Sequence, residues 1–372
     1  MIIAISANTS WYLYNFRKNT MLALISEGYE VIVVCPDNAY KEKIELLGCS
    51  FELIRMERKG KNPFKDLLSL YDFYKVYKKG KVDIVLNFTP KNNIYSTLAA
   101  KKLKIKVINN IAGLGVVFVK NNFISKLVSQ LYKLSQKKAD FIFFQNNEDL
   151  ELFNKNGIVT NGKYERIPGS GVDLSRFEYS PPVESTSIKF LLVARMIAEK
   201  GIYHYVNAAK ILKAKYPDTD FFLLGPLDET SSSGINKTEI VDWGKKGFIT
   251  YLGFSDNVES YLKEADCIVL PSYYREGVPK SLLEAAAIGR PIITTDNVGC
   301  REVVDDGING FLCVPDSATD LVRCIEMFIK AAPEKRKLMG IKSREKAKNE
   351  FNEEVVIKSY LEKIKTINQK NQ

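Results

Sequence analysis

The sequence predicts an α/β protein made of two doubly wound, Rossmann-like domains that face each other across a cleft. Its 372 residues suit two domains of about 100–200 residues each. Short β-branched runs alternate with amphipathic helical stretches, as expected for βαβ units with parallel sheets. This alternation restarts near Ile188, so a second domain of the same kind follows the first.

Six apolar runs in the first half are predicted to be strands: residues 2–6, 30–35, 50–54, 83–87, 106–110 and 141–144. The amphipathic stretches between them, including residues 16–27, 63–78 and 125–137, are predicted to be helices.

Six further runs are predicted strands of the second half: residues 189–194, 219–224, 249–252, 267–271, 291–295 and 310–313. Residues 168–187 are rich in Gly, Pro and Ser without periodicity, which places the domain boundary there. We therefore predict domains over residues 1–168 and 187–350. Ligands of such sheets bind beyond the carboxyl ends of the strands, so the loops after the strands are the informative ones.

Composition and charge limit the function classes. A hydrophobic fraction of 45% excludes wholesale disorder. Residues 1–180 hold 27 basic and 17 acidic side chains, whereas residues 181–372 hold 27 of each, so the first half carries the whole net charge of +10. Such a field suits an anionic partner: nucleic acid, anionic lipid or a polyphosphorylated substrate.

Cysteine spacing and hydropathy point to an intracellular protein. The six cysteines show no CxxC spacing, which predicts free thiols in a reducing compartment. The start, MIIAIS, has no basic segment before it and polar residues after it, unlike a signal peptide. Apolar runs fall short of the roughly 18 residues that cross a bilayer. We expect a cytoplasmic protein that can associate with a membrane.

Two cations follow the first strand of the second half. Arg195 and Lys200 lie five positions apart at a strand-to-helix turn. Together they can hold a diphosphate, with Arg195 as a fork of donors and Lys200 as a point charge. The alternative is a pair of solvated surface cations.

Two glutamates stand in the segment EGVPKSLLEAAAIG. Glu276 lies in a loop, and Glu284 lies in an apolar helix where a carboxylate is costly unless it meets donors such as sugar hydroxyls. Backbone amides of the loop and helix start can face an anion; the residues concerned are Gly277, Val278, Pro279, Lys280 and Ser281. The alternative is structural, with Glu284 capping a neighbouring loop.

These motifs resemble glycosyltransferase family 4, the retaining, metal-independent nucleotide-sugar transferases of the GT-B architecture. The seven-residue gap between Glu276 and Glu284 matches the paired-glutamate signature of that family, and Arg195 with Lys200 matches its basic pair. The segment GSGVDLSRF resembles its interdomain segment, and the loop at Gly253 and Phe254 resembles its nucleobase-side loop.

The resemblance implies roles for these residues. Arg195 and Lys200 would stabilise the leaving diphosphate, Glu284 would hold the ribose hydroxyls, and Glu276 would orient the donor sugar. The first domain would bind the acceptor and the second the nucleotide sugar, with residues 351–367 forming a helix that returns to the first domain. No metal ion and no cofactor are expected. Retention with no second carboxylate on the opposite face favours a front-side substitution assisted by the leaving phosphate.

The first half resembles a subgroup that extends glycans on undecaprenyl diphosphate, which includes capsule, O-antigen and N-glycan transferases. The acceptor-side residues would be Asn8, Gly113 and Gly115, the last two in INNIAGLGVVF, where a simple turn is the alternative. This loop lacks the His that many members carry there. The resemblance implies a UDP-linked N-acetylated hexosamine as donor, a lipid-linked glycan as acceptor, and a peripheral place on the anionic inner face of the cytoplasmic membrane.

Other functions fit less well. A GDP-sugar or other nucleotide-sugar transferase with a soluble acceptor is the main alternative. An epimerase needs histidines and carboxylates that this chain, with its single His, cannot supply, and a glycan phosphorylase needs a much longer chain with a cofactor lysine. No recognisable nucleic-acid-binding module is present, so we expect no nucleic-acid partner. The acidic pairs at Asp218 and Asp305 are assigned to a strand start and a turn rather than to metal binding.

Overall fold

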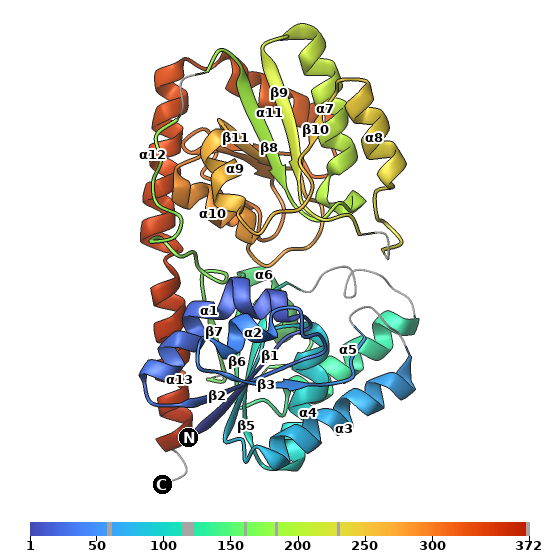
Figure 1. The fold of residues 1–372 in the computed structure, drawn as a ribbon, viewed down its shortest axis with the longest axis vertical. Coiled ribbons are helices and arrows are strands. Elements are labelled where there is room, and N and C mark those ends of the chain that lie inside the picture. Colours follow the sequence, from blue (N-terminus) through green and yellow to red (C-terminus); the bar gives the residue numbers. More distant parts are fainter. Residues whose placement is uncertain (58–61, 114–122, 160–161, 183–184, 229–230, 370–372) are drawn as a thin grey trace. The chain divides into compact units, whose positions relative to one another are not determined.

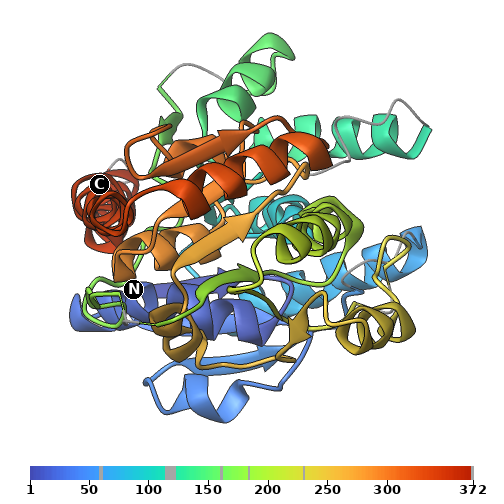
Figure 2. The same cartoon turned by 90° about the horizontal axis from the view of Figure 1, so that it is seen from above.

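A computed structural model describes residues 1–57, 62–113, 123–159, 162–182, 185–228 and 231–369 of the chain. It divides into two units, each an α/β domain with its own parallel sheet. The first unit contains residues 1–170 and 354–372, and the second contains residues 171–353. Figures 1 and 2 show helices on both faces of each sheet.

The first unit has a seven-stranded sheet of order β3-β2-β1-β4-β5-β6-β7, and every pairing is parallel. The strands are β1 (Ile2–Ser6), β2 (Glu30–Cys35), β3 (Ser50–Leu53), β4 (Ile84–Asn87), β5 (Lys106–Ile111), β6 (Phe141–Phe144) and β7 (Tyr164–Arg166). Central strands such as β4 and β6 are buried at every position, as expected where helices cover both faces of a parallel sheet.

The helices of the first unit are α1 (Ser10–Ser26), α2 (Lys41–Glu45), α3 (Pro63–Lys79), the π-helix η1 (Asn92–Ser96), α4 (Thr97–Lys102), α5 (Phe123–Gln136), α6 (Asn147–Lys155) and α13 (Glu353–Gln369). Helix α13 packs on one face of the sheet with Val356, Tyr360 and Ile364 in the core. Their spacing of four residues places the three side chains on one side of the helix.

The second unit has a six-stranded parallel sheet of order β10-β9-β8-β11-β12-β13. Its strands are β8 (Ile188–Val193), β9 (Thr219–Leu224), β10 (Thr250–Tyr251), β11 (Cys267–Leu270), β12 (Ile292–Thr295) and β13 (Gly310–Cys313). Its helices are η2 (Ala198–Lys200), α7 (Ile202–Lys215), α8 (Lys237–Lys245), α9 (Val258–Glu264), α10 (Lys280–Ile288), η3 (Arg301–Val303), α11 (Ala318–Lys330) and α12 (Pro333–Glu350).

The predicted strands all occur, with ends that move by one residue at most, which reduces the predicted strand 249–252 to Thr250–Tyr251. Two local features differ from the prediction. Strand β7 was not predicted, because only three residues of mixed polarity form it at the sheet edge. Helix α1 begins at Ser10 rather than at residue 16, because the side chain of Thr9 caps it by accepting from the Tyr12 amide.

Candidate active site in the second unit

Three loops meet at the carboxyl edge of the second sheet. Strand β11 pairs with β8 on one side and β12 on the other, so the segments after these strands emerge as neighbours. The loop after β8 carries Arg195 and Lys200, the loop after β11 carries Glu276, and the loop after β12 carries Asn297. Sheets of this type bind ligands at this edge.

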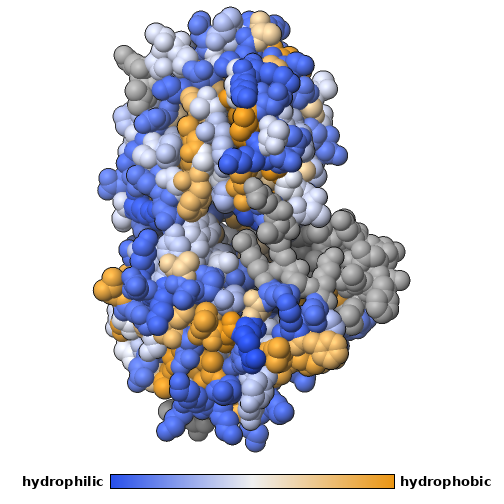
Figure 3. All heavy atoms as spheres, turned by 45° about the vertical axis from the view of Figure 1, so that its right-hand side comes forward, coloured by the Kyte–Doolittle hydropathy of each residue, from blue (hydrophilic) through white to orange (hydrophobic). Residues whose placement is uncertain are grey.

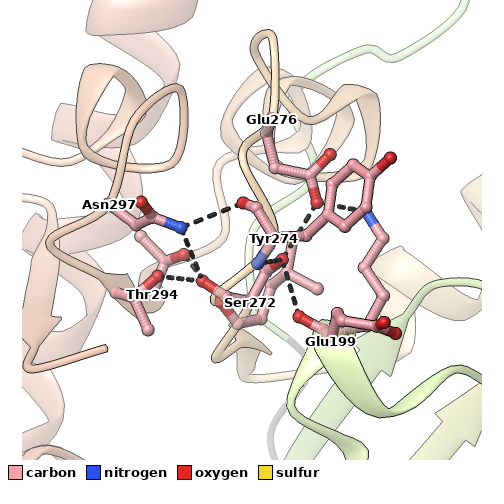
Figure 4. Close-up of polar contacts among 9 residues, drawn as sticks. Glu199, Ser272, Tyr274, Glu276, Thr294 and Asn297 are labelled. Carbon is pink, nitrogen blue, oxygen red and sulfur yellow. Dashed lines mark hydrogen bonds and ion pairs between the residues drawn. The ribbon is translucent and has the colours of Figure 1, made fainter. Parts of the chain in front are cut away.

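A glycine lets the first two loops touch. Gly201 ends η2 with φ +77°, and a Cβ there would lie 2.1 Å from the carbonyl oxygen of Pro271. The close approach lets the Glu199 carbonyl accept from two amides of the neighbouring loop, Tyr273 at 3.0 Å and Tyr274 at 3.2 Å, and brings the Ser272 hydroxyl within 3.2 Å of the same oxygen. Figure 4 shows this junction, which the sequence analysis did not find.

Lys200 and Glu276 form an ion pair across that junction. Their side chains are only 14% and 12% exposed, so the charges attract through a medium less polar than bulk water. The Ser272 hydroxyl donates to Glu276 Oε1 at 2.9 Å, which fixes the carboxylate from a second direction. The fold thus brings together two residues that lie 76 positions apart in the chain.

The loop after β12 supports the same segment from behind. Asn297 Nδ2 donates to the Tyr274 carbonyl at 2.9 Å (Figure 4). A Cβ on Gly299 would lie 1.4 Å from the Gly277 carbonyl oxygen, so these two backbones are in direct contact. Asn297 was missed by the sequence analysis, although a polar residue directly after a strand is the kind of signal that marks this sheet edge.

Arg195 lies beside the pair. Its guanidinium donates to Asp228 Oδ2 at 3.1 Å, and its side chain is 36% exposed. The pKa of the Tyr274 hydroxyl depends on the charges of Arg195 and Glu276. Burial is the main reason that this pKa is raised, Glu276 raises it further, and Arg195 lowers it. Lys200 Nζ lies 5.8 Å from the centre of the Tyr274 ring, so the charges of all three residues act near one aromatic side chain.

Glu284 lies apart, on α10. Its side chain is among buried apolar residues, and burial raises its carboxyl pKa from the ordinary 4.5 to about 7, although Lys280 and Arg176 both lower it. Lys280 Nζ donates to the Gly171 carbonyl at 2.8 Å. The N-cap of α10 is Pro279, whose side chain makes no capping hydrogen bond, and the helix start adjoins the loop formed by Gly277 and Val278.

The loop after β10 contains the other predicted donor-binding residues. Gly253 has φ +76° and accepts from the Gly225 amide at 2.7 Å, while the Phe254 side chain is 53% exposed. Arg176 donates to the Asp256 carbonyl at 3.4 Å and also acts on the Glu284 pKa. Arg176 thus connects this loop electrostatically with Glu284, a link that the sequence analysis did not predict.

The predicted acceptor-side residues lie in the first unit. Asn8 precedes the N-cap of α1, and Gly113 follows β5 with φ +91°. Gly115 lies outside the described residues. Within the described part of the chain, no group of three or more His, Cys, Asp or Glu side chains is placed to hold a metal ion. Among the same residues, no helix has the length and apolarity needed to span a bilayer.

Two family models match the chain. The model described as glycosyl transferases group 1 matches residues 176–346, and the one described as glycosyl transferase 4-like matches residues 2–146. The first covers every site residue of the second unit, and the two together cover most of the chain. The chain is a glycosyltransferase, and its second unit matches group 1. The predicted enzyme class and family are therefore confirmed.

Two bacterial relatives of this glycosyltransferase are named for their action on sugars linked to undecaprenyl diphosphate. It is 29% identical over 367 residues to the N,N'-diacetylbacillosaminyl-diphospho-undecaprenol alpha-1,3-N-acetylgalactosaminyltransferase of Campylobacter jejuni subsp. jejuni serotype O:2, with 94% of each chain covered. It is 27% identical to the UDP-Gal:alpha-D-GlcNAc-diphosphoundecaprenol alpha-1,3-galactosyltransferase of Escherichia coli, over 77% of this chain and 76% of that one.

Solved structures show the fold. Sucrose-phosphate synthase from Thermosynechococcus elongatus matches with a TM-score of 0.81 at 18% identity and covers 99% of each chain. Anabaena HepE, solved in complex with UDP, matches with a TM-score of 0.79 at 16% identity, over 98% of this chain and 100% of that one. The predicted architecture of two Rossmann-like domains, called GT-B, is confirmed by these likenesses.

Proposed function

We propose that this glycosyltransferase moves an N-acetylated hexosamine from UDP to a glycan linked to a polyprenyl diphosphate, with retention of anomeric configuration and without a metal ion. The observation that carries the donor site is the Lys200–Glu276 ion pair beside Arg195 at the carboxyl edge of the second sheet. The activities for which the Campylobacter and Escherichia relatives are named support the acceptor class.

The donor diphosphate would meet Arg195 and Lys200. When the bond from the anomeric carbon to the diphosphate oxygen breaks, negative charge grows on the distal phosphate and positive charge on the sugar ring. Two cations fixed by Asp228 and Glu276 stabilise that negative charge without moving. Backbone amides at the start of α10 would add further hydrogen-bond donors to the diphosphate.

The two glutamates would contact other parts of the donor. Glu276, oriented by Lys200 and Ser272, would accept from hydroxyls of the sugar. Glu284 would accept from the ribose hydroxyls, which offer the donors that its apolar surroundings lack. The exposed ring of Phe254 and the backbone at Gly253 would contact the base.

The first unit carries the observations that support the proposed acceptor and location. Asn8, Gly113 and Gly115 remain our candidates for acceptor contacts, and the excess of positive charge in residues 1–180 suits a diphosphate acceptor at an anionic membrane surface. Of the basic stretches that we predict to approach it, residues 55–64 and 118–124, large parts lie outside the described residues.

The test is transfer to a synthetic polyprenyl-diphosphate glycan in detergent, with a panel of UDP-, GDP- and ADP-sugars. We expect turnover with a UDP-HexNAc, unchanged by excess EDTA, and a product whose anomeric proton coupling matches that of the donor. Loss of activity on chelation, restored by Mn²⁺ or Mg²⁺, contradicts the metal-free mechanism. Preference for a GDP-sugar with a water-soluble sugar acceptor supports the alternative function.

A further inference from the structure

Helix α3 exposes an apolar surface on the first unit. Its side chains Ser69, Phe73 and Tyr77 are buried, at a spacing of four residues, and fix which face of the helix is turned inward. On the opposite face, four large side chains are exposed: Phe64 by 76%, Leu67 by 63%, Leu68 by 43% and Tyr71 by 54%. Their spacing of i, i+3, i+4 and i+7 places them on one stripe.

The same face becomes basic toward the helix end. Lys75, Lys78 and Lys79 continue the stripe over the last two turns, and all three are exposed. Figure 3, which turns the side of α3 and α5 toward the viewer, shows apolar and polar side chains next to each other on the first unit. An outward face with an apolar half and a cationic half is typical of helices that lie in a membrane interface.

The carboxylates of α3 do not cancel the positive charge of these lysines. Asp66 accepts from Lys91 Nζ at 2.6 Å and from the Tyr95 hydroxyl at 2.7 Å, on the inward side. Asp72 pairs with Arg55 at 2.6 Å, and this hydrogen bond is the main reason that its pKa is lowered. Each acidic side chain of α3 is thus neutralised by a basic partner, and the lysines on its outward face dominate.

We propose that this outward face of α3 docks the first unit on an anionic lipid bilayer, with Phe64, Leu67, Leu68 and Tyr71 in the interface and Lys75, Lys78 and Lys79 over the headgroups. The proposal rests on the proposed function, because a lipid-linked acceptor requires an enzyme at the membrane. A stable protein interface uses about 20–30 residues per side, far more than this stripe offers. A symmetric dimer through α3 would also place two sets of lysines in one interface.

Vesicle binding of the full-length enzyme tests the proposal. A variant with Gln at positions 64, 67, 68 and 71 keeps a helix-compatible surface and removes the apolar stripe. Its matched control carries Ile211→Gln and Val241→Gln, which change exposed apolar side chains of α7 and α8. We expect co-sedimentation with phosphatidylglycerol vesicles to fall at least tenfold for the α3 variant and to stay unchanged for the control.

The contribution of the lysines at the end of α3 is tested separately. Lys75, Lys78 and Lys79 changed to Glu should lower binding at least tenfold, since each basic residue near an anionic surface contributes about 1 kcal/mol. The control changes Lys335 and Lys337 of α12 to Glu. Wild-type binding should fall when phosphatidylcholine replaces the anionic lipid and when salt rises.

A direct readout locates the contact. All six native cysteines are buried, so a thiol-reactive, polarity-sensitive fluorophore will label Leu68→Cys selectively. We expect its emission to shift to shorter wavelength on anionic vesicles, whereas Val241→Cys carrying the same label should not respond. An α3 variant that binds vesicles like wild type, or a label at position 68 that stays in water, overturns the proposal, as does an α3-dependent dimer in sedimentation.

Failure of docking and failure of the proposed function give different results. The α3 variant should retain normal transfer to a lipid-linked acceptor dissolved in detergent. If wild type binds vesicles through α3 but transfers nothing to that acceptor, the proposed function is wrong and the docking surface stands. If transfer in detergent is normal but α3 does not affect vesicle binding, only the docking surface is wrong.

Discussion

Replacing Glu284 with glutamine should stabilise the second unit relative to wild type, and this gain in unfolding free energy should grow as the pH rises. Burial raises the pKa of the Glu284 carboxyl from 4.5, its ordinary value in an unfolded chain, to about 7. The native state therefore holds this proton more tightly than the unfolded state does. The stability that this tighter proton binding contributes is fully present below pH 4.5 and is lost as the pH rises through 7. Above pH 7 the ionised carboxylate destabilises the native state.

The magnitude follows from the same two pKa values. Each pKa unit corresponds to about 1.4 kcal/mol, so Glu284 lowers the unfolding free energy by about 3 kcal/mol at pH 8.5, where it is ionised in the native state. At pH 5.5, where only the unfolded chain ionises, it lowers the unfolding free energy by about 1 kcal/mol. Glutamine has a similar shape and carries no charge. For a unit of this size, 1 kcal/mol moves the melting temperature by about 2–4 °C. We expect Glu284→Gln to raise it by about 6–12 °C at pH 8.5 and by about 2–4 °C at pH 5.5.

Calorimetry of the full-length enzyme at both pH values measures this effect. Glu264→Gln is the control, because Glu264 is an exposed glutamate on α9 of the same unit. The control should melt like wild type at either pH. The reasoning is refuted if Glu284→Gln fails to stabilise the protein at pH 8.5, or if its effect does not change with pH. A stabilised variant that binds UDP at least tenfold more weakly would show that Glu284 is kept for function rather than for folding.

The other predictions concern the junction between the loops after β8 and β11. Lys200→Met should lower transfer at least about a hundredfold in a steady-state assay and destabilise the unit by about 3 kcal/mol in denaturant titrations, because Glu276 then lacks its cation. The double variant that also carries Glu276→Gln should regain stability but not activity. Full recovery of activity would contradict the assigned roles. Gly201→Ala should cost more than about 2 kcal/mol in the same titrations, since its Cβ would overlap the Pro271 carbonyl at a positive φ. The control, Gly247→Ala, has a similar φ of +71° but open space, so it should cost only about 1 kcal/mol, and equal losses would exclude the steric explanation.

Strand and helix patterning made the fold predictable. A parallel sheet covered on both faces needs nearly continuous apolar strands, and runs such as Cys267–Leu270 and Phe141–Phe144 cannot be mistaken for helices of useful length. Once the strands are known, the loops after them are known too. The placement of Arg195, Lys200 and Glu276 at one sheet edge is a consequence of that order.

What the sequence did not predict depends on contacts between distant segments. The Glu199 carbonyl accepts from two backbone amides after β11, and neither segment taken alone indicates that this backbone oxygen joins the two loops. Asn297 donates to the carbonyl of Tyr274, and the charge of Arg176 lowers the pKa of Glu284, so both also act on segments distant in the chain. Strand β7 is an edge strand of three residues, too short for a periodic pattern to emerge.

The paired glutamates show how far spacing alone can go. Spacing identifies two carboxylates, but their surroundings separate them. Glu276 has a cation and a hydroxyl donor in contact, so its charge is balanced in place. Glu284 lies among buried apolar side chains of α10, and Lys280 and Arg176 only partly offset the effect of burial on its pKa. A carboxylate held as Glu276 is held can orient a polar group without first gaining a partner. A carboxylate placed as Glu284 is placed gains most when hydroxyl donors arrive, which favours a role in binding the nucleotide over one in the transfer step.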